Sequence, residues 1–284
     1  MESIGIFFLK ALSRLPIGIL YAISNLLFFL IYSVFGYRKK VVMDNLRQSF
    51  PEKTEAELQR IMKQFYRNLC DIIVESLKMI SMSREEVIER NEYSEHSVVD
   101  ALNASGRSCF YFAGHVGNWE WSPDVAGIAS QVKLWGVYKP LSSKGMDELT
   151  KFYRSRFGCE MIAMDQIARR VITDKETKNI CFIADQTPAN PESNIWVDFL
   201  NRKTLFFSAS AKLAIKTKTP IVYGSLTRVK RGHYKYHFEV LVEHPEQMNE
   251  QEIMQRFASR LEQDIREQPD NWLWSHRRWK HTKA

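Results

Sequence analysis

Short apolar segments alternate with helical patterns along most of the chain, and this alternation restricts the possible folds more than any other feature. Six segments are typical of β-strands: residues 108–113, 132–138, 159–164, 179–185, 220–228 and 234–243. Most are separated by stretches long enough for a helix, which is typical of βαβ units, whereas the last two are joined only by VKRGH and indicate a hairpin. We therefore predict an α/β fold with a mostly parallel central sheet flanked by helices.

A long amphipathic helix is predicted before the sheet. Thr54 is followed three residues later by Glu57, which is the pattern of a capping box at a helix start. Apolar residues then recur at intervals of three and four from Leu58 to Ile80. This periodicity predicts one helix that ends near residue 80.

The segment from Pro16 to Phe35 contains no charged residue. Twenty helical residues would extend about 30 Å, the thickness of a bilayer's hydrocarbon core. We expect residues 1–40 to form an uncleaved membrane anchor and residues 41–284 to form one cytoplasmic domain, because Arg38, Lys39 and Lys40 follow the run directly. A partly inserted hairpin and a buried helix of a soluble core are the alternatives.

The chain is basic, with a formal net charge of +7 and a pI near 9.1. Such a charge attracts acidic partners, which include nucleic acid, anionic lipid and acidic carrier proteins. Basic clusters occur at residues 38–40, 228–235 and 276–283. A solvated surface is the alternative for each, although the first cluster adjoins the apolar segment. No helix-turn-helix, zinc-finger or RNA-recognition signature is present, so we expect no nucleic-acid partner. The four cysteines lack the spacing of a zinc site or a disulfide framework.

Polar residues follow three of the predicted strands. His115 comes after residues 108–113 and Lys139 after residues 132–138. Asp185 is the last residue of the segment 179–185, and Gln186 follows it directly. Ligand sites in parallel sheets lie beyond the carboxyl ends of the strands. We therefore expect these side chains to face one crevice, although Asp185 and Gln186 could merely cap a strand end.

The stretch GHVGNWEW, residues 114–121, places His115 five positions before Glu120. Residues five apart do not share a helix face, so contact between the two side chains needs a bend, which Gly114 and Gly117 would permit. A carboxylate on one imidazole nitrogen would leave the other free to act as a base. The turn has no serine or cysteine, so the proton would come from a substrate hydroxyl. A structural histidine is the alternative.

This stretch resembles the H-x-x-x-x-D/E motif of the glycerolipid acyltransferase superfamily, in the form found in the lipid A late acyltransferases and in related mycobacterial phosphatidylinositol mannoside acyltransferases. Four further elements are similar and occur in the same order: residues 37–58 (YRKKVVMDNLRQSFPEKTEAEL), VYKPL, FIADQTP and PDNWLWSHRRWK. Two stretches depart from the pattern. Lys139 stands where arginine is usual, and VDFLNRKT replaces a stretch that is richer in glycine.

The resemblance implies transfer of a fatty acyl chain from acyl carrier protein or acyl-CoA to a hydroxyl of a lipid A precursor or related lipid. The location would be the cytoplasmic side of the bacterial inner membrane, and neither a metal nor a cofactor would be needed beyond the thioester co-substrate. His115 would be the general base and Glu120 its orienting acid. Binding of substrate would fall to five other residues: Lys139, Asp185, Gln186, Arg277 and Arg278. Arg277 and Arg278 could instead help anchor the C-terminus.

Two other classes of function compete with this interpretation. A hydrolase could use His115 to activate water on an ester, although the chain lacks a G-x-S-x-G motif and a metal constellation. A non-enzymatic, membrane-tethered protein could use its basic residues to bind acidic lipid. In that case His115 would be dispensable.

Overall fold

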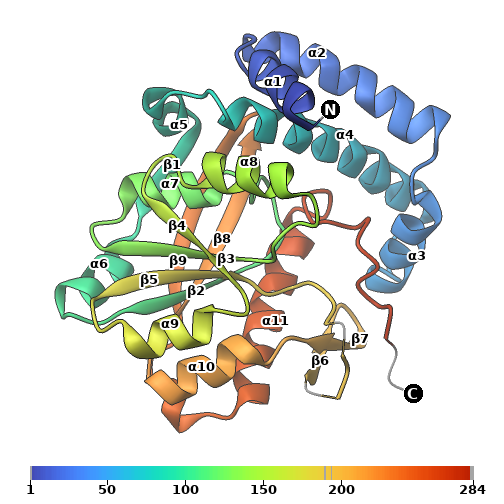
Figure 1. The fold of residues 1–284 in the computed structure, drawn as a ribbon. Helices are drawn as coiled ribbons and strands as arrows, with labels where there is room; N and C mark the ends of the chain where they lie inside the picture. Colours follow the sequence, from blue (N-terminus) through green and yellow to red (C-terminus); the bar gives the residue numbers. More distant parts are fainter. Residues whose placement is uncertain (1, 189, 193, 282–284) are drawn as a thin grey trace.

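A mostly parallel sheet of seven strands forms the centre of the molecule, as the sequence predicts (Figure 1). The computed structural model describes residues 2–188, 190–192 and 194–281. The strand order is β1-β9-β8-β2-β5-β3-β4, and β8, β2, β5, β3 and β4 run parallel to one another. β9 pairs antiparallel with β8, and β1 pairs parallel with β9. The predicted α/β class is therefore confirmed.

All six predicted strands are present, and every end lies within two residues of its expected bound. They are β2 (Cys109–Ala113), β3 (Lys133–Tyr138), β4 (Cys159–Ala163), β5 (Lys178–Ile183), β8 (Ile221–Lys230) and β9 (His233–Val242). Three further strands were not predicted: β1 (Asn91–Glu95) at the edge of the sheet, and the hairpin of β6 (Ile195–Phe199) and β7 (Arg202–Phe206).

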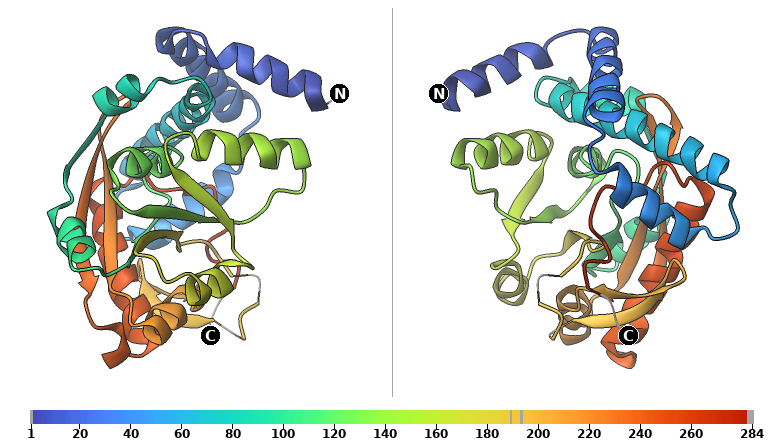
Figure 2. Two further views of the ribbon diagram at one scale, coloured as in Figure 1. Left: turned by 60° about the vertical axis from the view of Figure 1, so that its left-hand side comes forward. Right: turned by 90° about the vertical axis from the view of Figure 1, so that its right-hand side faces the viewer.

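Helices cover both faces of the sheet (Figure 2). Alternate residues of β2 belong to two separate cores, with Phe110 and Phe112 on one side and Cys109 and Tyr111 on the other. The helices are α3 (Lys39–Ser49), α4 (Glu55–Met79), α5 (Arg84–Arg90), α6 (Ser97–Ala104), α7 (Ser122–Ala129), α8 (Lys144–Arg154), α9 (Ile167–Thr173), α10 (Ala209–Thr217), the short η2 (Pro245–Gln247) and α11 (Glu250–Glu267).

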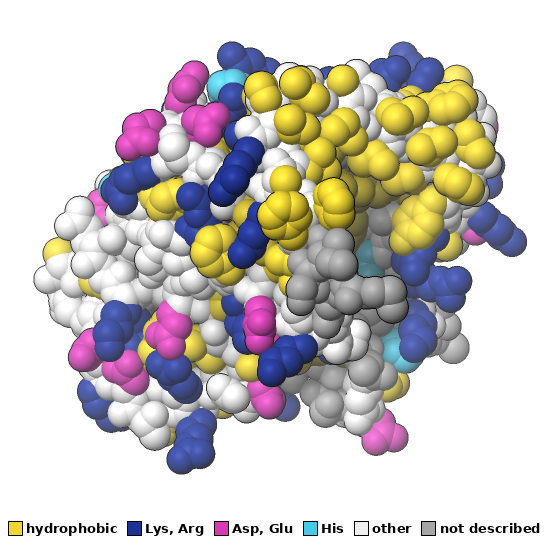
Figure 3. All heavy atoms as spheres, turned by 45° about the horizontal axis from the view of Figure 1, so that its top comes forward, with side chains coloured by type: hydrophobic (Ala, Val, Ile, Leu, Met, Phe, Trp, Pro, Cys, Tyr) yellow, Lys and Arg dark blue, Asp and Glu magenta, His cyan; other side chains and the backbone are white. Residues whose placement is uncertain are grey.

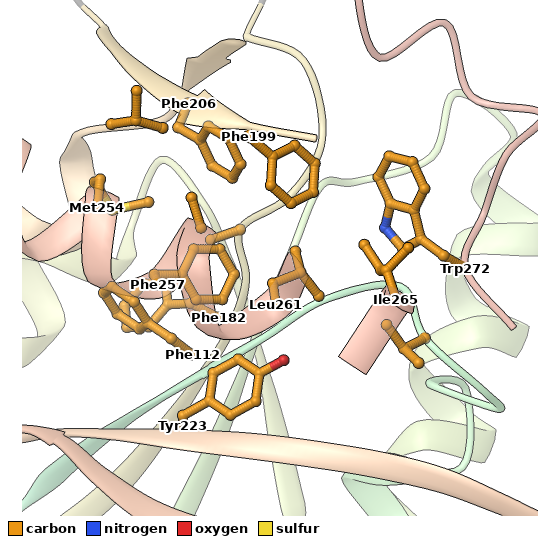
Figure 4. Packing of buried hydrophobic residues seen from close by; sticks show 14 of the residues in the cluster. Phe112, Phe182, Phe199, Phe206, Tyr223, Met254, Phe257, Leu261, Ile265 and Trp272 are labelled. Atoms are coloured by element: carbon orange, nitrogen blue, oxygen red, sulfur yellow. The ribbon is translucent and has the colours of Figure 1, made fainter. Parts of the chain in front are cut away.

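The larger core lies between α11, the sheet and the β6–β7 hairpin (Figure 4). Phe257 and Leu261 of α11 are fully buried and pack beside Phe112 of β2. Trp272, which follows α11, belongs to this core, and its indole N–H donates to Asp185 beyond the end of β5. The core thus fixes the position of the chain that leaves β2.

The predicted long helix is α4, and its start is confirmed. The Thr54 side chain accepts a hydrogen bond from the backbone N–H of Glu57, and the Glu57 carboxylate accepts one from the backbone N–H of Thr54. This reciprocal cap satisfies two donors that a helix end leaves unpaired.

The N-terminal apolar segment forms α1 (Glu2–Ser13), α2 (Ile17–Phe28) and a π-helical continuation, η1 (Phe29–Val34). Residues 17–34 are long and apolar enough to cross a membrane, and only 11% of this stretch is buried. α2 packs along α4 through Leu20 and Ser24.

Candidate active site

The topology brings together the polar strand ends that the sequence singled out. β5 lies between β2 and β3 in the sheet, and the three strands are parallel. Ala113 is opposite Ile183 in the register, so His115 and Asp185 each lie two residues beyond paired strand ends. Lys139 directly follows the neighbouring β3. The three strand ends therefore lie side by side at one edge of the sheet, and that Lys139 faces the same crevice as His115 stays a prediction.

Asp185 holds both the ring and the backbone of His115. Its Oδ1 lies 2.5 Å from Nδ1 of His115, and its Oδ2 accepts a hydrogen bond of 2.9 Å from the His115 backbone N–H. The indole Nε1 of Trp272 donates to the same Oδ2 at 2.7 Å. The carboxylate of Asp185, which is 2% exposed, is therefore fixed from three directions.

These contacts keep Asp185 ionised. Burial alone would raise the pKa of Asp185, but the charge of His115 and the hydrogen bonds from His115 and Trp272 outweigh it and lower that pKa to about 2. An ionised carboxylate can only accept hydrogen bonds, so Nδ1 of His115 carries a proton. Nε2 is then the basic nitrogen.

Gln186 lies against that basic nitrogen. Its amide Nε2 is 3.0 Å from Nε2 of His115, and an N–H of the amide can donate to the ring lone pair. The Gln186 side chain is exposed, whereas the imidazole of His115 is only 13% exposed. A substrate hydroxyl that displaces Gln186 would meet the basic nitrogen directly.

Two glycines allow the chain to turn this closely, as predicted. A Cβ at residue 114 would lie 2.5 Å from Cδ1 of Leu261 and 3.3 Å from Oδ2 of Asp185. Gly117 has φ +57°, a conformation that other residues rarely adopt, and a Cβ there would press on Leu226.

The predicted pairing of His115 with Glu120 is wrong. Glu120 instead accepts hydrogen bonds from Arg154 of α8, at 3.0 Å from Nε and at 2.6 and 2.8 Å from Nη2. The hydroxyl of Tyr153 donates to the same carboxylate at 3.0 Å. Glu120 faces α8 because the chain beyond residue 117 turns into α7. The carboxylate that binds His115 comes instead from Asp185, just after β5.

The C-terminal segment closes the site from the other side. Leu273 N–H donates to the His115 carbonyl oxygen at 3.2 Å, and Gly117 N–H donates to the Asn271 carbonyl at 2.9 Å. His276 Nε2 accepts a hydrogen bond of 3.1 Å from the backbone N–H of Thr187. From the sequence, Trp272 is expected at most to help anchor the C-terminus and His276 has no predicted role, although both lie in the WLWSHRRW stretch.

The two arginines of this segment lie in different surroundings. Arg277 is exposed, whereas Arg278 is 1% exposed and its guanidinium has no hydrogen-bond partner within the described part of the chain. The guanidinium lies 4.2 Å from the Phe206 ring centre, and burial lowers the pKa of Arg278 to about 9. The position of Arg278 fits anchoring of the C-terminal segment and rules out a surface charge at this residue.

Comparison with known protein families gives one decisive result. The profile of the bacterial lipid A biosynthesis acyltransferases matches residues 1–281. The chain belongs to that family. It is therefore an acyltransferase of lipid A biosynthesis, with an acyl donor and a lipid acceptor as substrates, and the family is typically membrane-associated. Comparison with curated proteins gives no match.

An apolar groove lies beside the N-terminal helices of this acyltransferase. It has a volume of about 600 Å³ and is lined by Ile31 and Phe35 of the N-terminal segment, Leu69 and Ile73 of α4, and Leu273 and His276 near His115. Its lining is mainly apolar, and Leu273 is hydrogen-bonded to His115. The groove thus extends from the N-terminal helices to the C-terminal segment whose backbone binds the His115 carbonyl oxygen.

Proposed function

We propose that the protein transfers a fatty acyl chain from a carrier thioester to a hydroxyl group of a lipid A precursor at the membrane surface. One observation carries this proposal: Asp185 fixes Nδ1 of His115, while Nε2 lies at the strand ends beside the exposed Gln186. A histidine held in this way is suited to take a proton from a substrate hydroxyl.

The chemistry needs only these residues and the two substrates. Nε2 of His115 removes the proton from the acceptor hydroxyl as its oxygen attacks the thioester carbonyl carbon. A new C–O bond forms, the C–S bond breaks, and the departing thiolate takes the proton back from the imidazolium. Asp185 stabilises the positive charge that His115 carries between the two proton transfers.

Other residues are proposed to bind the substrates. Gln186 contacts Nε2 of His115 and would yield this place to the acceptor hydroxyl. Lys139, which is exposed at the neighbouring strand end, would attract an acidic group of the acceptor, and the exposed Arg277 would attract the acidic donor. Glu120 is proposed to position the turn through Arg154 and to take no part in proton transfer.

An assay of the reaction products tests the proposal. Purified protein in detergent would be given a lipid A precursor with either acyl carrier protein or coenzyme A as the thioester donor. We expect mass spectrometry to detect the acylated lipid, and the faster donor identifies the carrier. Free fatty acid without acylated lipid would indicate a hydrolase, and no reaction of either donor would contradict acyl transfer.

A further inference from the structure

The N-terminal helices carry an apolar surface that the rest of the molecule leaves uncovered. Figure 3 shows hydrophobic side chains gathered on this face, with Lys and Arg at its edges. We call it the N-terminal apolar face, and its members are at least 48% exposed: Phe7, Phe8, Ile19, Leu26, Phe29, Val34 and Phe35. Contiguous apolar surfaces of this kind mark contact with a membrane or a partner.

The opposite side of the same segment is polar and tied to the body. The Tyr21 hydroxyl donates to Glu75 at 2.9 Å, and the Ser24 hydroxyl donates to Asp71 at 2.6 Å. Arg231, at the tip of the β8–β9 hairpin, donates to the Asn25 side chain at 3.1 Å. α2 is thus amphipathic in its contacts, although its sequence is uncharged.

A spanning orientation would destroy these contacts. Glu75 and Asp71 are buried acids, and withdrawal of α2 from α4 would take the Tyr21 hydroxyl from Glu75 and the Ser24 hydroxyl from Asp71. It would also expose Tyr21, Ser24 and Asn25 to hydrocarbon, where unpaired polar groups are costly. A helix that lies along the membrane surface keeps every one of these contacts.

We propose that α1, α2 and η1 lie in the plane of the membrane, with the N-terminal apolar face buried among the lipids and the polar side still docked on α4. Charge complementarity favours a bilayer as the occupant. Residues 5–40 carry Lys10, Arg14, Arg38, Lys39 and Lys40 and no acidic residue. Apolar anchors beside basic residues are the features that bind anionic lipid surfaces.

This orientation explains the position of the groove. Phe35 belongs to both the N-terminal apolar face and the groove lining, and Ile73 of the groove is 46% exposed. The membrane side of the molecule is therefore continuous with the groove, which ends at Leu273, the residue whose backbone N–H binds the His115 carbonyl oxygen. A lipid chain can enter this groove sideways from the bilayer. This inference deepens the proposed acyl transfer but does not require its chemistry.

Labelling of single added thiols tests the orientation in sealed vesicles. The added cysteines are Gly5→Cys, where the space around the residue is open, and the exposed Lys40→Cys. We expect a membrane-impermeant maleimide to label both positions from the same side, and a fluorophore at Leu26→Cys to report a shallow depth. Labelling from opposite sides, or a Leu26 label at the bilayer centre, would overturn the proposal.

Binding of the full-length protein to vesicles gives a second test. Leu26→Glu and Phe29→Glu should each weaken binding to phosphatidylglycerol vesicles about tenfold or more, because each removes a buried apolar anchor. Ile172→Glu, on α9 far from this face, is the matched control and should bind like the wild type. Equal binding of all three folded variants would overturn the proposal. Since no substrate is present, this result is independent of acyl transfer.

Discussion

Arg154 and Glu120 form a bidentate ion pair that joins α8 to the turn after β2, with Nη2–Oε distances of 2.6 and 2.8 Å. The two side chains are only 21% and 17% exposed. Glu120, the acid of the H-x-x-x-x-E motif, therefore fixes the turn to a neighbouring helix. The acid that binds the His115 ring is Asp185, which follows β5.

Removal of either partner of this pair should destabilise the protein. Glu120→Gln and Arg154→Met should each lower the free energy of unfolding by about 1.5–3 kcal/mol, since each breaks charged hydrogen bonds and leaves a half-buried partner. Urea denaturation measures the loss, and the double variant should lose less than the sum. Glu55→Gln is the matched control, because the Arg47–Glu55 pair is exposed and contributes little. A control loss equal to that of Glu120→Gln would contradict this role.

Glu75 links helix α2 to the turn after β2 that carries His115. It is fully buried and accepts hydrogen bonds from Tyr21, Tyr234 and, at 2.7 Å, from Asn118 within residues 114–121. Burial raises the pKa of Glu75 above its usual value. Because the pKa of Glu75 is higher in the folded protein than the reference value of 4.5, protonated Glu75 stabilises the fold below about pH 4.5. This stabilisation is lost as the pH rises through the folded-state pKa.

Glu75→Gln, which cannot ionise, should therefore lose less stability than the wild type as the pH rises above about 4.5. Chemical denaturation across this range measures the difference, and parallel pH profiles would contradict it. Glu75→Ala should in addition slow acyl transfer, because Asn118 loses its partner. Asn118→Ala should reproduce that effect on the rate with normal vesicle binding.

His276 should make stability depend on pH in the acidic range. Burial, and then the charge of Arg278, lowers the pKa of His276 to about 4 from 6.5. Only the neutral ring of His276 can accept the hydrogen bond from the Thr187 N–H. The stabilisation that neutral His276 provides is therefore complete above about pH 6.5 and is lost as the pH falls through about 4. His276→Gln should flatten the rise in unfolding free energy between these pH values. An unchanged slope would contradict this assignment.

Arg278 is retained in the core at a cost in stability. Its buried guanidinium lacks a hydrogen-bond partner among the described residues, so Arg278→Met should leave the free energy of unfolding unchanged or higher. The positive charge of Arg278 attracts Asp185, which holds the ring of His115. Loss of this charge should slow acyl transfer about tenfold, which is a part of the 10²–10⁴-fold acceleration that a general base contributes. Arg277→Met, on the exposed neighbour, is the control. Full activity of Arg278→Met would assign the residue to packing alone.

The sequence predicts the sheet well because most strands are continuous apolar runs between helical patterns. It misses β1, whose residues NEYSE are polar and pair only at the sheet edge. It also misses the β6–β7 hairpin, in which Leu200 and Asn201 turn with φ of 49° and 64°. Asparagine favours this conformation, but the preceding leucine gives no such signal.

The candidate site shows why spacing alone was insufficient. Glu120 is the nearest acid to His115 in sequence, yet the acid that binds the ring lies 70 residues away. That contact depends on β2 and β5 being neighbours, which the sequence of strands does not determine. The strand-end argument, in contrast, correctly placed His115, Asp185 and Gln186 together because it used the geometry of parallel sheets.

The central claim is that His115 and Asp185 act as one unit, and a double-mutant cycle on the acyl-transfer rate tests it most directly. His115→Ala should reduce kcat by about 10²–10⁴, and Asp185→Asn should approach the same loss because the amide favours the wrong tautomer of His115. The double variant should be little slower than His115→Ala. Multiplied losses in folded proteins, or a near-normal rate of His115→Ala, would contradict the account.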